Sequence, residues 1–285
     1  MSKKLRIGGA SGFWGDSVVA TPQLLNGNNL DFIVYDYLAE ITMSIMARAR
    51  AKDPSKGYAI DFVSSVMKLN LRQIADQKVK ILSNAGGVNP QACAEAIRAL
   101  IKELNLDLKV AVVLGDDLLE DKDKFLDSGV QEMYSDEKFP EVDKIASINA
   151  YLGAFPIAQA LNDGADIVIT GRSVDSAVTL AACIHTYGWK EDDYDKLASG
   201  SLAGHIIECG TQSTGGNFTD WELVSKDLHM IGYPIVDVSE NGEFICTKSN
   251  NTSGLVSFGT VAEQMLYEIG DPQAYILPDV VCDFS

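Results

Sequence analysis

Short apolar runs alternate with helical stretches along the first two-thirds of the chain, and this alternation most constrains the fold. The five runs are Leu5–Gly9, Phe32–Tyr35, Val79–Leu82, Val110–Leu114 and Ile167–Thr170. Continuous apolar runs of this length suit strands that are buried on both faces, as in a parallel sheet. The pattern therefore predicts an α/β protein with a mainly parallel, doubly wound sheet.

Several segments between these runs carry helical signals. Tyr37–Ala51 and Tyr58–Ala75 are long and amphipathic, and Val174–Tyr187 is largely apolar. Asn89 is a good N-cap and is followed by Pro90, which suits the first position of a helix. We expect these helices to pack against the sheet.

The pattern changes after about residue 190. Ile235–Val238 and Phe244–Thr247 flank Asn241-Gly242, a dipeptide that strongly favours a tight hairpin. We therefore predict an α/β core over residues 1–190 and a smaller, incomplete α+β section over residues 191–285. The chain stops on the apolar run around Val280, so we expect a homo-oligomer or a partner chain that completes the C-terminal part.

The charge balance excludes some classes of partner. The chain has 40 acidic and 23 basic side chains, which gives a formal net charge of −17. An acidic surface repels nucleic acid and anionic lipid, so we expect neither as a partner. No apolar run reaches the length of a membrane span, and the five cysteines are scattered. These features predict a cytoplasmic protein with reduced thiols.

The candidate site lies where the predicted strands end, because ligands of open α/β sheets bind at the carboxyl ends of the strands. The loops there are short, polar and rich in glycine, which lets backbone N–H groups approach an anionic ligand. The first loop matches neither a P-loop nor G-x-S-x-G nor G-x-G-x-x-G, so it indicates only an anion-binding turn. The residues selected for binding are Gly9, Ser11 and Gly12 after the first strand, Asn84, Gly86 and Gly87 after the third, and Ser173 after the fifth.

Four charged side chains in these loops are candidates for catalysis. Asp36 and Glu40 are candidate general bases, although Asp36 could instead cap the next helix and Glu40 could favour its first turn. Arg172 can hold a carboxylate in a two-point grip, with Asp175 lending a side-chain bond. The structural alternative for Arg172 is an ion pair with Asp175 or Asp36.

A metal site is not predicted. Asp36, Asp116 and Asp117 could supply oxygen ligands, but no spacing specifies such a site. His205 and Glu208 stand three residues apart, and no second pair accompanies them. Metal-dependent hydrolysis would need a carboxylate cluster that closes on one point.

The same loops resemble those of a known family, the acyclic terpene utilisation (AtuA) family, along essentially the whole chain. The matching segments run from Ile7 to Asp16, Asp36 to Glu40, Asn84 to Pro90, Thr170 to Ser176, Val261 to Pro272 and Leu277 to Val280. The resemblance implies breakdown of citronellol- and geraniol-type terpenoids through acyl-CoA thioesters. It brings no residue roles, and it implies that the domain continues beyond this chain.

Together these observations favour an enzyme of acyclic terpenoid, acyl-CoA or small carboxylate catabolism, of lyase or hydratase type. Its ligand would be a small anionic substrate, with a CoA thioester as one form. The alternative is a non-catalytic ligand-binding or partner subunit of such an enzyme. An exposed apolar face without catalytic geometry would favour this alternative.

Overall fold

The computed structural model describes residues 4–16 and 18–285. Its centre is a seven-stranded sheet in the order β4-β5-β3-β2-β1-β6-β7. The strands are β1 (Leu5–Gly9), β2 (Phe32–Tyr35), β3 (Lys80–Ser83), β4 (Val110–Val113), β5 (Ile167–Thr170), β6 (Pro234–Val238) and β7 (Phe244–Lys248). β1 to β5 are parallel, whereas β6 and β7 run antiparallel. The predicted mainly parallel α/β fold is therefore confirmed.

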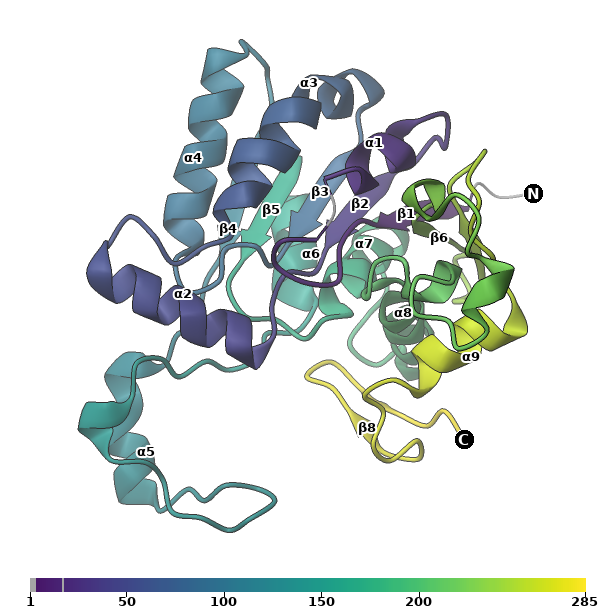
Figure 1. The fold of residues 1–285 in the computed structure, drawn as a ribbon. Coiled ribbons are helices and arrows are strands. Elements are labelled where there is room, and N and C mark those ends of the chain that lie inside the picture. Colours follow the sequence, from purple (N-terminus) through teal and green to yellow (C-terminus); the bar gives the residue numbers. More distant parts are fainter. Residues whose placement is uncertain (1–3, 17) are drawn as a thin grey trace.

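Helices cover both faces of the sheet (Figure 1). One core is formed with α1 (Ala20–Leu25), α2 (Glu40–Lys52), α3 (Lys68–Gln77) and α4 (Pro90–Glu103). The opposite core is formed with α6 (Phe155–Asn162), α7 (Ala177–Tyr187) and α8 (Tyr194–Ile207). α9 (Phe258–Leu266) packs against α8. Among the described residues, no helix is long and apolar enough to cross a membrane.

Three helix predictions need correction. The helix predicted from Val174 begins only at Ala177. The helix predicted from Tyr37 begins only at Glu40, with Ala39 in the extended conformation at the N-cap position. The segment predicted as one regular helix over Tyr58–Ala75 contains the π-helical turns of Phe62–Met67 before α3. The spacing of apolar residues in a sequence does not reveal a π-helical turn, because such a turn is a local widening of the backbone helix.

The C-terminal third contributes to the same sheet. β6 and β7 form a hairpin across Asn241 and Gly242, and Gly242 has a φ of +94°. β6 pairs with β1, so residues beyond 190 extend the seven-stranded sheet. A separate small sheet joins β8 (Tyr275–Ile276) to β9 (Val281–Cys282). The domain boundary near residue 190 stays a prediction.

The arrangement of connections creates a crevice at the end of the sheet. β3 and β5 are neighbours. β3 leads into α4 on one face, whereas β5 leads into α7 on the opposite face. Loops that leave adjacent parallel strands toward opposite faces separate at the carboxyl ends, and ligands bind there in open α/β sheets. The fold therefore places the loops after β2 and β5 around one potential binding site, with the loop after β3 beside them.

A long arm leaves the body between β4 and α6 (Figure 1). It contains α5 (Lys122–Ser128), and no residue from 117 to 153 is buried. Met133 and Tyr134 expose 79% and 86% of their surface. The arm has no buried core of its own. In the isolated chain it is therefore ordered only by local contacts and by its attachment to the body.

The close packing of β1 against α8 leads to a testable prediction. A Cβ added to Gly9 would lie 2.2 Å from the carbonyl oxygen of Ile207, whereas one added to Gly270 would meet open space. We expect Gly9→Ala to lower the free energy of unfolding by about 1–3 kcal/mol through overpacking. Gly270→Ala is the matched control, with a change within about 0.5 kcal/mol. Urea denaturation measures both, and equal stability of the two variants would contradict the packing described.

Candidate functional site

A cavity of about 480 Å³ lies at the carboxyl ends of β2 and β5. Its walls come from the loops after these strands, from the turn after α9, from β8 and from the arm. The residues that line it are Gly12, Asp36, Leu38, Ala39, Glu40, Tyr134, Tyr151, Arg172, Val174, Asp175, Cys209, Tyr267, Glu268, Tyr275, Ile276 and Leu277. All four side chains selected for catalysis, Asp36, Glu40, Arg172 and Asp175, are among them.

Arg172 forms part of the cavity wall and is already engaged by carboxylates. Its Nη1 lies 2.6 Å from Asp175 Oδ1 and donates to the carbonyl of Ser173 at 3.0 Å. Its Nη2 lies 3.8 Å from Glu40 Oε1, and its Cζ lies 4.1 Å from the ring centroid of Tyr151. The ion pair with Asp175 is thus present, and the guanidinium is only 4% exposed. These contacts fix the position of the guanidinium, which forms one face of the cavity.

Asp36 is buried beside other carboxylates. Asn84 donates to its Oδ1 at 2.5 Å, and Asn84 also accepts from the backbone N–H of Tyr37. Burial raises the pKa of Asp36 well above its usual value, and the charges of Asp175 and Glu208 add to this. Asp36 therefore favours its protonated form, in which a carboxyl group can donate a hydrogen bond.

Glu40 is in the opposite protonation state. Its side chain is 79% exposed at the cavity mouth, and it accepts a hydrogen bond from the hydroxyl of Tyr151. This hydrogen bond lowers the pKa of Glu40. The cavity thus combines a carboxyl group that favours its proton with one that favours its charge, which is the usual separation of an acid from a base. Glu40 also begins α2, whereas Asp36 does not cap this helix.

The glycines and serines selected for binding mostly hold the loops together. Ser11 Oγ donates to the carbonyl of Asp36 at 2.9 Å, and Ser173 is fully buried. A Cβ on Gly9 would meet Ile207, and one on Gly86 would lie 2.4 Å from the carbonyl oxygen of Thr170. Their smallness lets neighbouring loops approach closely.

Two of the selected glycines line pockets, but they line different pockets. Gly12 lines the main cavity, whereas Gly87 lines a separate pocket of about 300 Å³ with Arg50 and Asp117. Gly87 has a φ of +53°. Asp116 and Asp117, which were considered as metal ligands together with Asp36, make other contacts. Asp116 accepts from the backbone N–H of Arg172, and Asp117 pairs with Arg50 at 3.1 Å.

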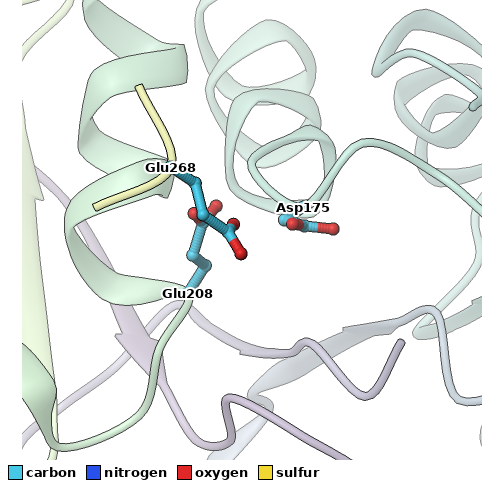
Figure 2. Close-up of side chains that lie close together, drawn as sticks. All are labelled: Asp175, Glu208 and Glu268. Carbon is cyan, nitrogen blue, oxygen red and sulfur yellow. The ribbon is translucent and has the colours of Figure 1, made fainter. Parts of the chain in front are cut away.

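Three carboxylates that come from distant parts of the chain meet at the cavity (Figure 2). Oxygens of Asp175, Glu208 and Glu268 lie within 4.8 Å of one another. Figure 2 shows Glu208 and Glu268 side by side with Asp175 facing them. Among the described residues, no fourth His, Cys, Asp or Glu side chain lies within this distance of all three. Asp175 and Glu268 line the cavity, and Glu208 lies just behind its wall.

His205 backs this carboxylate group. Its Nδ1 lies 2.8 Å from Glu208 Oε1, and the imidazole is fully buried. Burial raises the pKa of Glu208 to about 7, although the neighbouring His205 lowers it. Burial opposes the charge of His205, but the neighbouring Glu208 raises its pKa above the usual value. The two groups therefore titrate as a coupled pair.

The sequence selected the strand-end part of this site and missed the rest. Glu208 follows α8 and Glu268 follows α9, so neither lies after a strand. The three-residue spacing of His205 and Glu208 was the one sequence feature that pointed to Glu208. This spacing did not indicate that Glu208 lies beside the cavity.

Comparison with known proteins gives one match. The family described as acyclic terpene utilisation family protein AtuA matches residues 5–285. The chain belongs to this family. No curated protein and no solved structure matches. Membership in the AtuA family connects the chain with acyclic terpene utilisation. It agrees with the resemblance found in the strand-end loops. The roles of the site residues are inferred from the geometry alone.

Proposed function

We propose that this AtuA family member is an enzyme of acyclic terpenoid breakdown that moves protons on an acyl thioester or a related small carboxylate. One observation carries the proposal. A cavity of about 480 Å³ is lined by Asp36, which favours its proton, by Glu40, which favours its charge, and by the guanidinium of Arg172. This separation of acid from base around a fixed cation is suited to general acid–base catalysis.

The roles follow from the chemistry of the three groups. Arg172 and the protonated Asp36 would stabilise negative charge on the substrate carbonyl oxygen. Glu40 would take a proton from the carbon beside that carbonyl, and the electron pair of the broken C–H bond would form the enolate. Loss of a β-hydroxyl from the enolate, with a proton from an acid, would release water. This is a lyase or hydratase reaction and needs no oxidant.

The charges of the cavity favour the thioester over the free acid. Asp36, Glu40, Asp175 and Glu268 line it, and Arg172 already faces two of these carboxylates. A free carboxylate would add another negative charge to this group, whereas a thioester carbonyl is neutral. The volume lies within the range of small-molecule sites and suits the acyl part of a thioester.

Hydrogen exchange tests this function directly. Acyclic unsaturated and 3-hydroxy acyl-CoA thioesters would first be screened by thermal shift, because a ligand of the native state raises the melting temperature. Incubation in D₂O should then introduce deuterium beside the thioester carbonyl, as read by mass spectrometry. We expect Glu40→Gln to slow this exchange by about 10²- to 10⁴-fold. Glu95→Gln, which removes an exposed carboxylate of α4, is the control and should exchange at the wild-type rate.

The exposed arm supports the second candidate function, a non-catalytic partner subunit. It presents Met133 and Tyr134 to solvent, and Tyr134 also borders the cavity. An exposed apolar tip of this kind suits contact with another chain. Thioester binding without any deuterium exchange, in wild type and variants alike, would favour this candidate over the enzyme.

A further inference from the structure

His205, which lies beside Glu208, is held by hydrogen bonds between α8 and α9. His205 lies in the last turns of α8, and its Nε2 lies 3.3 Å from the carbonyl oxygen of Met265 in α9. The amide of Gln264 donates to the carbonyl of His205 at 2.6 Å. These contacts join α8 to α9 and hold the imidazole in place behind the cavity.

The contact with Met265 settles which nitrogen carries a hydrogen. A carbonyl oxygen only accepts, so Nε2 must donate to it. Nδ1 of His205 lies 2.8 Å from Oε1 of Glu208, which is ion-pair distance but not an aligned hydrogen bond, and one further proton can reside on either group. Whether this proton is on the imidazole or on the carboxyl, the pair has no net charge. Because both side chains are buried, this pair differs from a surface ion pair and can retain a proton for later transfer.

We infer that His205 and Glu208 form a proton store that exchanges a proton with the cavity through Asp175 and Glu268. This inference rests on the proposed function, since it names the source of the proton that the reaction uses. The oxygens of Glu208, Asp175 and Glu268 lie within 4.8 Å of one another, a separation that one bridging water can span. Asp175 and Glu268 line the cavity and can meet a substrate there.

The transfer balances in charge and in atoms. The pair gives its proton to the carboxylate of Asp175 or Glu268, so that carboxylate becomes neutral and the pair becomes singly negative. The protonated carboxyl then donates to the substrate, for instance to a departing hydroxyl that leaves as water. The proton abstracted from the substrate, or one from solvent, returns to the pair by the reverse path.

The surroundings of Glu208 keep the proton available at neutral pH. Burial and the carboxylates around it raise its pKa to about 7. In a buried acidic setting, an added negative charge is opposed, so the proton is retained until a nearby base accepts it. The titratable groups that face Glu208 from the elements around it are His205, Cys209, Asp36, Asp175, Tyr267, Glu268 and Tyr275.

Nitrogen NMR of the imidazoles tests the pair without any substrate. The chain has three histidines, so single substitutions assign their signals. In wild type, we expect Nε2 of His205 to stay protonated and the pKa of His205 to exceed 6.5. In Glu208→Gln, the supporting charge is lost while burial remains, so the pKa of His205 should fall below 6.5. His185, which lies on α7 and contacts Asn162 of α6, should be unchanged and serves as the internal control.

Activity then tests the transfer. We expect Glu208→Gln to slow the loss of water from a 3-hydroxy acyl thioester by about a hundredfold and to remove the limb of the pH profile near pH 7, with Glu208→Asp restoring part of both. A wild-type His205 protonated only on Nδ1, or an unchanged His205 in Glu208→Gln, would overturn the pair. A wild-type rate of water loss in a Glu208→Gln variant whose NMR shift is as expected would overturn the transfer. If wild type exchanges no thioester while the NMR result holds, the proposed function fails and the pair stands.

Discussion

Arg172→Ala should lower the free energy of unfolding at pH 8 by about 3 kcal/mol. Removing one partner of a buried ion pair costs about 3–5 kcal/mol, and the lower end applies because the Asp175 side chain is 24% exposed. Without Arg172, the charge of Asp175 would remain near Asp36 and Glu208, and it already raises the pKa of both. Urea denaturation at pH 8 measures the change.

The cost should shrink at acidic pH. The pKa of Asp175 is already raised by burial against the lowering effect of Arg172, so the alanine variant should protonate Asp175 more readily still. We therefore expect a smaller loss at pH 5 than at pH 8. Arg48→Ala removes an exposed arginine from α2 and should change stability by no more than about 0.5 kcal/mol at either pH.

A double variant separates the ion pair from packing. In Arg172→Ala with Asp175→Asn, no buried charge is left unpaired, so part of the lost stability should return. A double variant no more stable than Arg172→Ala alone would show that the guanidinium acts through its packing on Tyr151 and not through Asp175. Arg172→Lys keeps the charge but loses the planar group that faces Tyr151, so an intermediate loss is expected.

The strands could be predicted because their apolar runs are local in the sequence. All five predicted parallel strands appear, and the Asn241-Gly242 hairpin forms where the dipeptide indicated. Once strands are parallel, the residues that follow them must share one edge of the sheet. This is why Asp36 and Arg172, 136 residues apart in the chain, could be assigned to one site before their contacts were known.

The rest of the site depends on packing that has no local signal. Glu208 reaches the cavity because α8 lies against α9 and Gly204 allows close approach to Ser176. Glu268 reaches it from a turn in which its own φ is +61°. Neither the crossing of two helices nor a left-handed glutamate follows from periodicity. The start of α2 illustrates the same limit, since Asp36 is turned toward Asn84 and away from the helix.

A final prediction uses the energetic cost of the proposed proton store. The free energy of unfolding should fall as pH rises from about 4.5 to above 7. A carboxyl whose pKa is raised in the folded state stabilises that state fully below its unfolded pKa, and this contribution is lost as pH rises through the folded pKa. For Glu208 these limits are 4.5 and about 7, which corresponds to about 3 kcal/mol. Asp36 and Asp175 act in the same direction because their pKa values are also raised.

Glu208→Gln separates this cost from the general repulsion of a chain with a net charge of −17. Glutamine has the shape of a glutamate that never loses its proton, so the variant should be more stable than wild type at pH 8 and close to it at pH 5. Urea midpoints at the two pH values measure the difference, and Glu95→Gln should run parallel to wild type. Equal slopes for wild type and Glu208→Gln would mean that Glu208 does not titrate in this range. A variant that gains stability while losing proton transfer would show that the buried carboxyl is retained for the chemistry of the cavity, at the expense of the fold.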